Sequence, residues 1–192
     1  VGNNVITPFT LAAAGASQAF PNVTPGNHII GEVVKPGYTV SAGCTVNEVP
    51  IPDGLPDNPA DVAIEILDGQ NVVRTFVNTL NVTTYTVAKD FSDDATDVVG
   101  VELGCTSGTV SPLGVQDLSE GNPVEFTVTG ATGTPLCTAL ESNIPAGYTS
   151  DTSACIDDEL SSGGCTITNT LNTANFTVAK DFSDNAADVV GV

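Results

Sequence analysis

The amino-acid sequence predicts an all-β protein built from tandem β-sandwich modules, and three observations support that expectation. Short runs rich in Val, Thr, Ile and Phe alternate with Gly, Pro, Asn, Asp and Ser about every 8–12 residues, which is typical of strands joined by turns. No stretch sustains the hydrophobic period of a helix, and residues 62–67 fit a short helix or a strand equally well. A segment of sixteen residues recurs 91 positions later, which is the length of a whole domain and not of a solenoid repeat.

The repeated segment defines the expected modules. Residues 86–101 read TVAKDFSDDATDVVGV and residues 177–192 read TVAKDFSDNAADVVGV, so two of the sixteen positions differ. The tetrapeptide Asn-Thr-Leu-Asn precedes both copies. We expect three parts: an incomplete module at residues 1–81, a complete module at 82–172, and the first strand of a further module, or a donor strand for the next subunit, at 173–192. No TVAKDF segment precedes the first module, so we expect it to lack its first strand.

A weaker similarity relates the interiors of the two modules. Residues 44–48 (CTVNE) resemble residues 137–141 (CTALE), and an Ile-Pro-x-Gly sequence follows each of them. This alignment makes Glu48 the counterpart of Glu141.

Three expected strands of the complete module carry a polar residue on their apolar face. Alternate side chains of a strand share a face, and this parity turns three polar residues inward. They are Lys89 in residues 85–91, Glu141 in residues 137–141 and Asn169 in residues 165–171. Because an unpaired buried charge is costly, such a core needs an explanation. One interpretation is a buried Lys–Glu ion pair with the Asn hydrogen-bonded to it, or strands whose two faces are both partly solvated.

The other interpretation is a chemical crosslink. Burial favours the neutral form of a lysine amine, which can attack the carboxamide carbon of Asn while a Glu carboxyl polarises the oxygen and shuttles protons. Ammonia then leaves and an isopeptide bond remains. The chain contains only three lysines, and two of them, Lys89 and Lys180, occupy the same position of the repeated segment.

The order of these motifs resembles the CnaB/SpaA-type domains of bacterial surface proteins and pilins, which have a prealbumin-like, Ig-like β-sandwich. The matching motifs are a Lys in an opening strand (TVAKDF), a Glu followed by Pro-x-Gly-Tyr (ALESNIPAGY) and an Asn in a closing strand (TITNT). The resemblance covers the second module fully and the first in part. It implies that Lys89 is bonded to Asn169, with Glu141 as the catalytic acid.

The first module departs from this pattern. Glu48 and Asn78 are present and face inward by the same parity, but no matching lysine precedes them, since Lys35 stands before Pro36 in an interior segment. The tail carries the missing strand, so we expect Lys180 of one chain to reach Asn78 and Glu48 of the next. The alternative is that these 192 residues belong to a longer repeat array, in which the same strand is supplied in cis.

The cysteines predict disulfides. Their spacing fits no zinc site, and the single histidine, His28, which we expect at the surface, cannot complete one. Cys105 and Cys137 each share a strand face with apolar residues, and Cys155 and Cys165 flank a Ser- and Gly-rich turn. We therefore expect the pairs Cys105–Cys137 and Cys155–Cys165, with Cys44 outside them in the first module. Disulfides imply an oxidising compartment and hence an extracellular protein.

The charge of the chain limits its partners. Four Lys and Arg residues stand against 23 Asp and Glu residues, which gives a net charge of −19. So acidic a surface repels nucleic acid and anionic membranes. No apolar run is long enough to insert into a membrane. Three sequons, at Asn22, Asn81 and Asn175, permit N-glycosylation outside the cell.

An acidic cluster follows each copy of the repeated strand. Its members are Asp90, Asp93, Asp94 and Asp97, echoed by Asp181, Asp184 and Asp188. Carboxylates at a module junction are calcium ligands in principle, but their spacing matches no EF-hand loop and such clusters are usually solvated turns. No nucleophile, phosphate-loop or cofactor motif is present, so we expect no metal, no cofactor and no enzyme beyond a single-turnover crosslinking reaction.

These features predict a structural protein. We expect a subunit of an extracellular filament, pilus or stalk that is stiffened by isopeptide bonds and polymerises with itself, head to tail, by strand donation. The alternative is the repeat region of a cell-surface adhesin whose loops bind a ligand.

Overall fold

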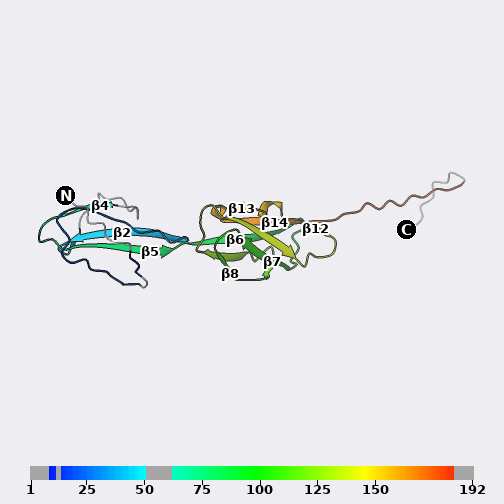
Figure 1. Cartoon of the computed structure of the whole chain (residues 1–192). Coiled ribbons are helices and arrows are strands. Elements are labelled where there is room, and N and C mark those ends of the chain that lie inside the picture. The colour runs from blue at the N-terminus through cyan, green and yellow to red at the C-terminus, as the bar shows by residue number, and fades with distance from the viewer. Residues whose placement is uncertain (1–8, 12–13, 51–61, 184–192) are drawn as a thin grey trace.

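The computed structural model describes residues 9–11, 14–50 and 62–183, and in this part of the chain it consists almost entirely of strands (Figure 1). A first strand group contains β1 (Gly26–Ile30), β2 (Tyr38–Val46), β3 (Val49–Pro50), β4 (Val62–Ile66) and β5 (Val72–Leu80). A second strand group contains β6 (Val82–Phe91), β7 (Val99–Cys105), β8 (Thr109–Ser111), β9 (Gln116–Leu118), β10 (Val124–Thr129), β11 (Leu136–Ser142), β12 (Tyr148–Asp151), β13 (Asp158–Glu159) and β14 (Gly164–Leu171).

The all-β prediction is confirmed. Helix is limited to two single 3-10 turns in the described residues, η1 (Ser153–Cys155) and η2 (Leu160–Ser162). The segment that the sequence left between helix and strand is the strand β4. No helix in the described residues has the length and apolar character needed to cross a membrane.

The second strand group forms two sheets that share one core. The strand orders are β12-β14-β6-β10-β8 and β13-β11-β7-β9. Fully buried side chains come from both sheets, since Tyr85, Phe126 and Ile167 of the first meet Val101 and Ala139 of the second. Alternation explains this burial, because every second residue from Tyr85 to Phe91 in β6 and from Phe126 to Val128 in β10 is buried, while the residues between them are more exposed.

The first and last strands of this group are parallel neighbours. β6 and β14 pair in parallel, with Lys89 opposite Ile167 and Phe91 opposite Asn169. Paired residues point to the same side of a sheet, so all four side chains face the core.

Two disulfides reinforce the second strand group. Cys105 of β7 is bonded to Cys137, its direct partner on β11, and Cys155 of η1 is bonded to Cys165 of β14. These are the two pairs expected from the sequence.

The first strand group is smaller and less well packed. Its sheets have the orders β1-β4 and β3-β2-β5, and its core centres on Cys44 and Ile64. β5 pairs with β2 along one edge and with no described strand along the other. Every residue of β5 is at least partly exposed, whereas Ile167 and Asn169 of β14 are fully buried.

A single residue, Asn81, separates the two strand groups. Its amide N–H donates to Gly37 O at 2.9 Å, its carbonyl accepts from Gly130 N at 2.8 Å, and its side-chain Nδ2 donates to Ala131 O at 3.2 Å. Gly37 has a φ of +81°, and a Cβ there would lie 2.5 Å from Gly130 O. The junction is thus short, hydrogen-bonded on both sides and closely packed, and the strand groups follow one another along an elongated molecule (Figure 1).

Hydrogen bonds at the ends of β5 and β14, the last strand of each group, show which strands of the two groups correspond. Asn81 N donates to Gly37 O and Asn172 N donates to Gly147 O at nearly equal distances, 2.9 and 2.8 Å. Thr39 Oγ1 donates to Asn81 Oδ1, and Thr149 Oγ1 donates to Asn172 Oδ1, both at 2.7 Å. β2 is therefore the counterpart of β12. The expected match of residues 44–48 with 137–141 is wrong, and Glu32, shortly before β2, takes the place of Glu141. The Ile-Pro-x-Gly part of that match, residues 51–54, lies outside the described residues.

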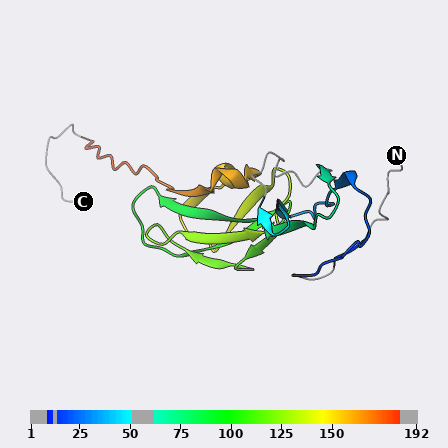
Figure 2. The ribbon, with the colours of Figure 1, turned by 90° about the vertical axis from the view of Figure 1, so that its left-hand side faces the viewer.

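After β14 the chain projects away from the sheets. Residues 172–183 form no strand, and both ribbon views show them extending beyond the second strand group (Figures 1 and 2). The remainder of the expected third part, residues 184–192, lies outside the described residues.

Candidate isopeptide site

Lys89, Glu141 and Asn169 meet in the core of the second strand group. β6 and β14 place the Lys and the Asn on adjacent strands of one sheet, and β11 places the Glu on the facing sheet. Glu141 Oε1 lies 3.4 Å from Lys89 Nζ and accepts a hydrogen bond from Asn169 Nδ2 at 2.9 Å. One carboxylate oxygen thus contacts both the amine and the carboxamide.

The lysine is fully enclosed. Its side chain is 0% exposed, and Nζ donates to the carbonyl oxygens of Ile167 at 3.2 Å and Asp90 at 3.4 Å. Nζ also lies 4.4 Å from the centre of the Phe91 ring. Desolvation lowers the pKa of Lys89 below its usual range, although the charge of Glu141 acts in the opposite direction. Burial therefore lowers the free energy needed to form the neutral, nucleophilic amine.

Glu141 is held on both carboxylate oxygens. Its side chain is 1% exposed, and Oε2 accepts a hydrogen bond from Ser150 Oγ. Ser150 of β12 is the direct pairing partner of Asn169 on β14, so the same pair of strands orients the carboxylate and the carboxamide. Sequence reasoning missed Ser150. The available signal was its parity with Tyr148 on a strand next to the one that carries Asn169.

Only one of the two polar atoms of the Asn169 carboxamide has a hydrogen-bond partner. Asn169 is 0% exposed, and its Oδ1 is buried without a hydrogen-bond partner. A buried acceptor without a partner costs free energy that a fully bonded side chain would not incur. The carbonyl oxygen of the group expected to react is therefore the one polar atom of this triad without a stabilising contact.

Aromatic rings lie beside the triad. Phe91 and Tyr148 pack edge to face with ring centres 5.2 Å apart, and the Tyr148 hydroxyl donates to both oxygens of Asp93, at 2.8 and 2.9 Å. The rings shield the Lys89 amine on the side of Phe91. Asp93, expected in an acidic turn, thus serves to fix Tyr148.

The first strand group departs from the predicted site. Glu48 is exposed and does not face inward, because it lies with Asn47 in the two-residue turn between the paired residues Val46 and Val49. Both turn residues have positive φ, 48° and 67°, as a tight hairpin requires. Asn78 is also exposed, and its Nδ2 donates to Glu32 Oε1 at 2.8 Å. The expected pairing of Glu48 with Asn78 is wrong, and Glu32 is the acid beside Asn78.

The structure also places His28, Lys180 and the three sequon asparagines. His28 is buried in β1, with Nε2 2.8 Å from Thr24 O, so its expected surface position is wrong. Lys180 is exposed on the projecting segment and stacks on Phe182 at 4.4 Å, as Lys89 stacks on Phe91. Asn22 and Asn175 are exposed, whereas the Nδ2 of Asn81 is engaged at the junction.

The acidic turns form no recognisable metal site in the described residues. No group of three or more His, Cys, Asp or Glu side chains there is placed to hold a metal ion. Two members of the second cluster, Asp184 and Asp188, lie outside the described residues.

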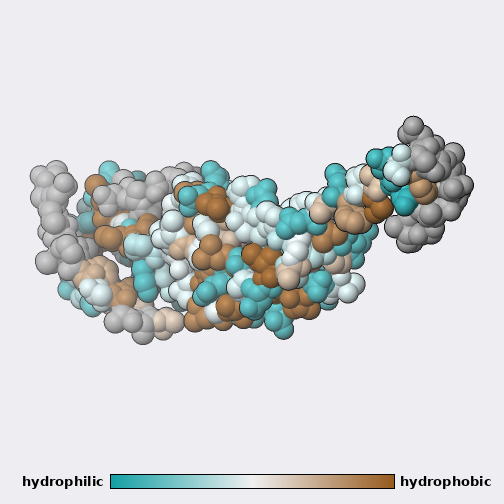
Figure 3. Space-filling view, turned by 90° about the vertical axis from the view of Figure 1, so that its right-hand side faces the viewer, coloured by the Kyte–Doolittle hydropathy of each residue, from teal (hydrophilic) through white to brown (hydrophobic). Residues whose placement is uncertain are grey.

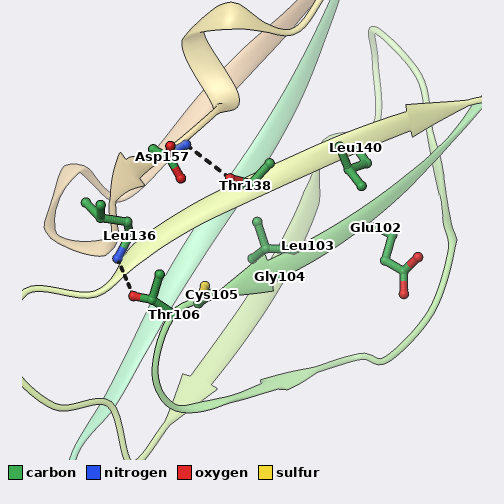
Figure 4. Close-up of a pocket in the computed structure, with 9 residues that line it drawn as sticks. All are labelled: Glu102, Leu103, Gly104, Cys105, Thr106, Leu136, Thr138, Leu140 and Asp157. Atoms are coloured by element: carbon green, nitrogen blue, oxygen red, sulfur yellow. Dashed lines mark hydrogen bonds between the residues drawn. The ribbon is translucent and has the colours of Figure 1, made fainter.

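A shallow groove of about 380 Å³ lies on the outer face of the β7–β11 pair (Figure 4). Hydrogen bonds from Leu136 N to Thr106 Oγ1 and from Asp157 N to Thr138 Oγ1 cross it at 3.0 and 3.1 Å. The triad residues do not line this groove.

Comparison of this chain with protein-family models, with curated proteins and with solved structures found no match. The functional argument therefore rests on the geometry of the triad and on the arrangement of the strands.

Proposed function

We propose that this chain is a structural component of an extracellular filament or stalk, built from Ig-like β-sandwich modules and stabilised by an isopeptide bond between Lys89 and Asn169. The observation that carries the proposal is the contact of Glu141 Oε1 with both reacting groups, the amine at 3.4 Å and the carboxamide at 2.9 Å. A plain ion pair would not require a buried carboxamide beside it.

The reaction follows from this geometry. The neutral Lys89 amine attacks Cγ of Asn169, which forms the C–N bond and moves the carbonyl electrons onto Oδ1. A half-turn of the carboxamide would bring Oδ1 to Glu141, and the carboxyl formed when Glu141 takes the ammonium proton of Lys89 would donate to Oδ1. Glu141 then carries the amine proton to the departing nitrogen. Collapse of the intermediate releases ammonia and leaves an amide between the two side chains.

The position of the bond suits a load-bearing function. The chain enters the second strand group at β6 and leaves it at β14, and these strands are neighbours. A bond from Lys89 to Asn169 would carry tension directly from one strand to the other. The strands from β7 to β13 would then bear no load, because they lie within the closed loop.

The covalent framework fits an environment outside the cell. The two disulfides indicate an oxidising compartment. The single-residue junction at Asn81 limits bending between the strand groups, as a stalk requires.

Intact-mass measurement under denaturing conditions tests the proposed bond. The wild-type chain should be lighter than its sequence mass, corrected for two disulfides, by one ammonia molecule. Glu141→Ala and Lys89→Ala should restore the full mass, and Lys35→Ala should not. An unmodified mass for folded, oxidised wild-type protein would refute the proposal.

A further inference from the structure

The first strand group contains a second copy of the acid–amide pair. Asn78 Nδ2 donates to Glu32 Oε1 at 2.8 Å, and Asn169 Nδ2 donates to Glu141 Oε1 at 2.9 Å. The flanking hydrogen bonds that equate β2 with β12 place the two pairs in corresponding positions. In the second strand group the pair lies against Lys89 of β6, whereas β5 has no described strand at the corresponding edge.

Two polar side chains in this part of the first strand group have buried atoms without hydrogen-bond partners. Glu32 Oε2 is buried without a hydrogen-bond partner, whereas Glu141 Oε2 accepts from Ser150. All three guanidinium nitrogens of Arg74 on β5 are also buried without partners. Arg74 and Asn78 lie on the same face of β5, on either side of Phe76, and the Arg74 guanidinium lies 5.5 Å from the centre of the Phe76 ring. Because Asn78 holds Glu32, the buried atoms without hydrogen-bond partners belong to Arg74 and to the acid beside Asn78.

The projecting segment carries the complementary strand. Residues 177–182 read TVAKDF, as residues 86–91 of β6 do. In the structure residues 177–182 form no strand, and all of them except the partly buried Phe182 are exposed, with Val178 57% exposed. Figure 3 shows hydrophobic surface along the projecting segment. When the same six residues form β6, every second one is buried, and the residues between them are partly or fully exposed.

We propose that the open edge of β5 binds residues 177–182 of a second copy of this chain, and that Lys180 of that copy forms an isopeptide bond with Asn78. The inference rests on the chemistry proposed for Lys89 and Asn169. In the register of β6 against β14, Lys180 lies opposite Phe76 and Phe182 lies opposite Asn78. The amine attacks Cγ of Asn78, Glu32 transfers the proton to the leaving nitrogen, and ammonia departs.

Residues 177–182 can reach the edge of β5 only on another molecule. The first strand group and the projecting segment lie at opposite ends of the elongated chain, with the second strand group between them (Figure 1). The contact therefore joins the tail of one copy to the head of the next. Such a heterologous contact does not close on itself and generates a filament.

Denaturing gel electrophoresis of the concentrated 192-residue chain tests the proposal. The wild type should give a ladder of multimers that survives boiling in detergent and reductant. Lys180→Ala, Asn78→Ala and Glu32→Ala should each abolish the ladder. Lys35→Ala and Glu48→Ala should leave it intact, because Lys35 has no place in the site and Glu48 lies exposed in the β2–β3 turn. A ladder that persists in Lys180→Ala, or a folded wild-type chain without a ladder, would overturn the inference.

A synthetic peptide distinguishes loss of the crosslinking reaction from loss of folding. Lys180 is exposed outside the sheets, so the Lys180→Ala chain keeps an intact first strand group. A synthetic peptide of residues 173–183 should add to that chain once, with loss of one ammonia, and the same peptide with Ala at position 180 should not. The mass of the Lys180→Ala monomer reports the Lys89–Asn169 bond independently, so failure of the two proposals can be told apart. An unmodified chain after incubation with the lysine peptide would contradict the inference.

Discussion

Lys89 and Asn169 lie on adjacent parallel strands, displaced from one another by two residues in register, with both side chains turned into one core. Lys89 is paired directly with Ile167, whose carbonyl it contacts at 3.2 Å. The displacement lets the long amine side chain extend along the sheet toward the shorter carboxamide. Glu141 reaches both from the facing sheet.

Loss of the crosslink should destabilise the second strand group strongly. The bond between Lys89 and Asn169 would close a loop of about 80 residues, and the loop-closure entropy of such a loop contributes about 4.5 kcal/mol. Glu141→Ala removes the bond and leaves a buried amine, so its free energy of unfolding should fall by at least that amount. Urea denaturation measures the difference. Glu102→Ala, an exposed carboxylate on the neighbouring β7, is the matched control and should change stability little. Equal stabilities of the two variants would contradict a stabilising bond.

The stability of an unreacted chain should rise with pH. In Asn169→Ala the amine cannot react, and burial keeps the pKa of Lys89 below its usual value of 10.5. The folded state then binds fewer protons than the unfolded state at pH values between the two pKa values, so the free energy of unfolding increases with pH across that interval. Denaturant midpoints measured toward pH 10 test this.

Subtraction of the same series for the double variant Asn169→Ala/Lys89→Met removes the contribution of every other titrating group. A difference between the two series that stays constant with pH would show that the lysine pKa is not lowered by folding.

The close approach at the junction should tolerate no side chain. Gly37 has φ +81°, and an added Cβ would meet Gly130 O at 2.5 Å. Gly69 has a similar φ of +73° but nothing within 4 Å. Gly69→Ala should therefore cost only the left-handed backbone penalty of about 1–2 kcal/mol. Gly37→Ala should cost more and should also loosen the junction.

Small-angle X-ray scattering measures the loosening as a broader distribution of lengths for Gly37→Ala than for Gly69→Ala. Indistinguishable scattering and stability for the two variants would show that the Gly37–Gly130 contact does not set the geometry of the junction.

Pulling the second strand group by its two ends should show whether the force passes directly from β6 to β14. Under reducing conditions, the wild-type second strand group should release little length when pulled through residues 82 and 171. Lys89→Ala should release the whole group, about 30 nm for some 90 residues at roughly 3.5 Å each. Single-molecule force spectroscopy measures both lengths. A full-length release step in the wild type would mean that no bond joins β6 to β14.

The sequence by itself determined the residues of the main site. Strand parity turned Lys89, Glu141 and Asn169 toward one core because the side-chain period of a strand is two whatever the tertiary context. Local signals were also sufficient for the all-β class and for the two cysteine pairs. Most of these inferences depend on a pattern within one strand or across one short turn, whereas the Cys105–Cys137 pair joins strands 32 residues apart.

Only the tertiary structure decided which strands are counterparts in the two groups. Five similar residues suggested that Glu48 corresponds to Glu141, but those residues form a β2–β3 hairpin whose turn exposes the carboxylate. The true counterpart, Glu32, precedes a Pro-Gly-Tyr-Thr sequence that matches Pro-Ala-Gly-Tyr-Thr after Glu141 with one residue fewer. Hydrogen bonds from Asn81 to Gly37 and from Asn172 to Gly147 establish that match. The side chain that completes a buried site depends on which strands lie side by side, and that pairing joins residues far apart in the sequence.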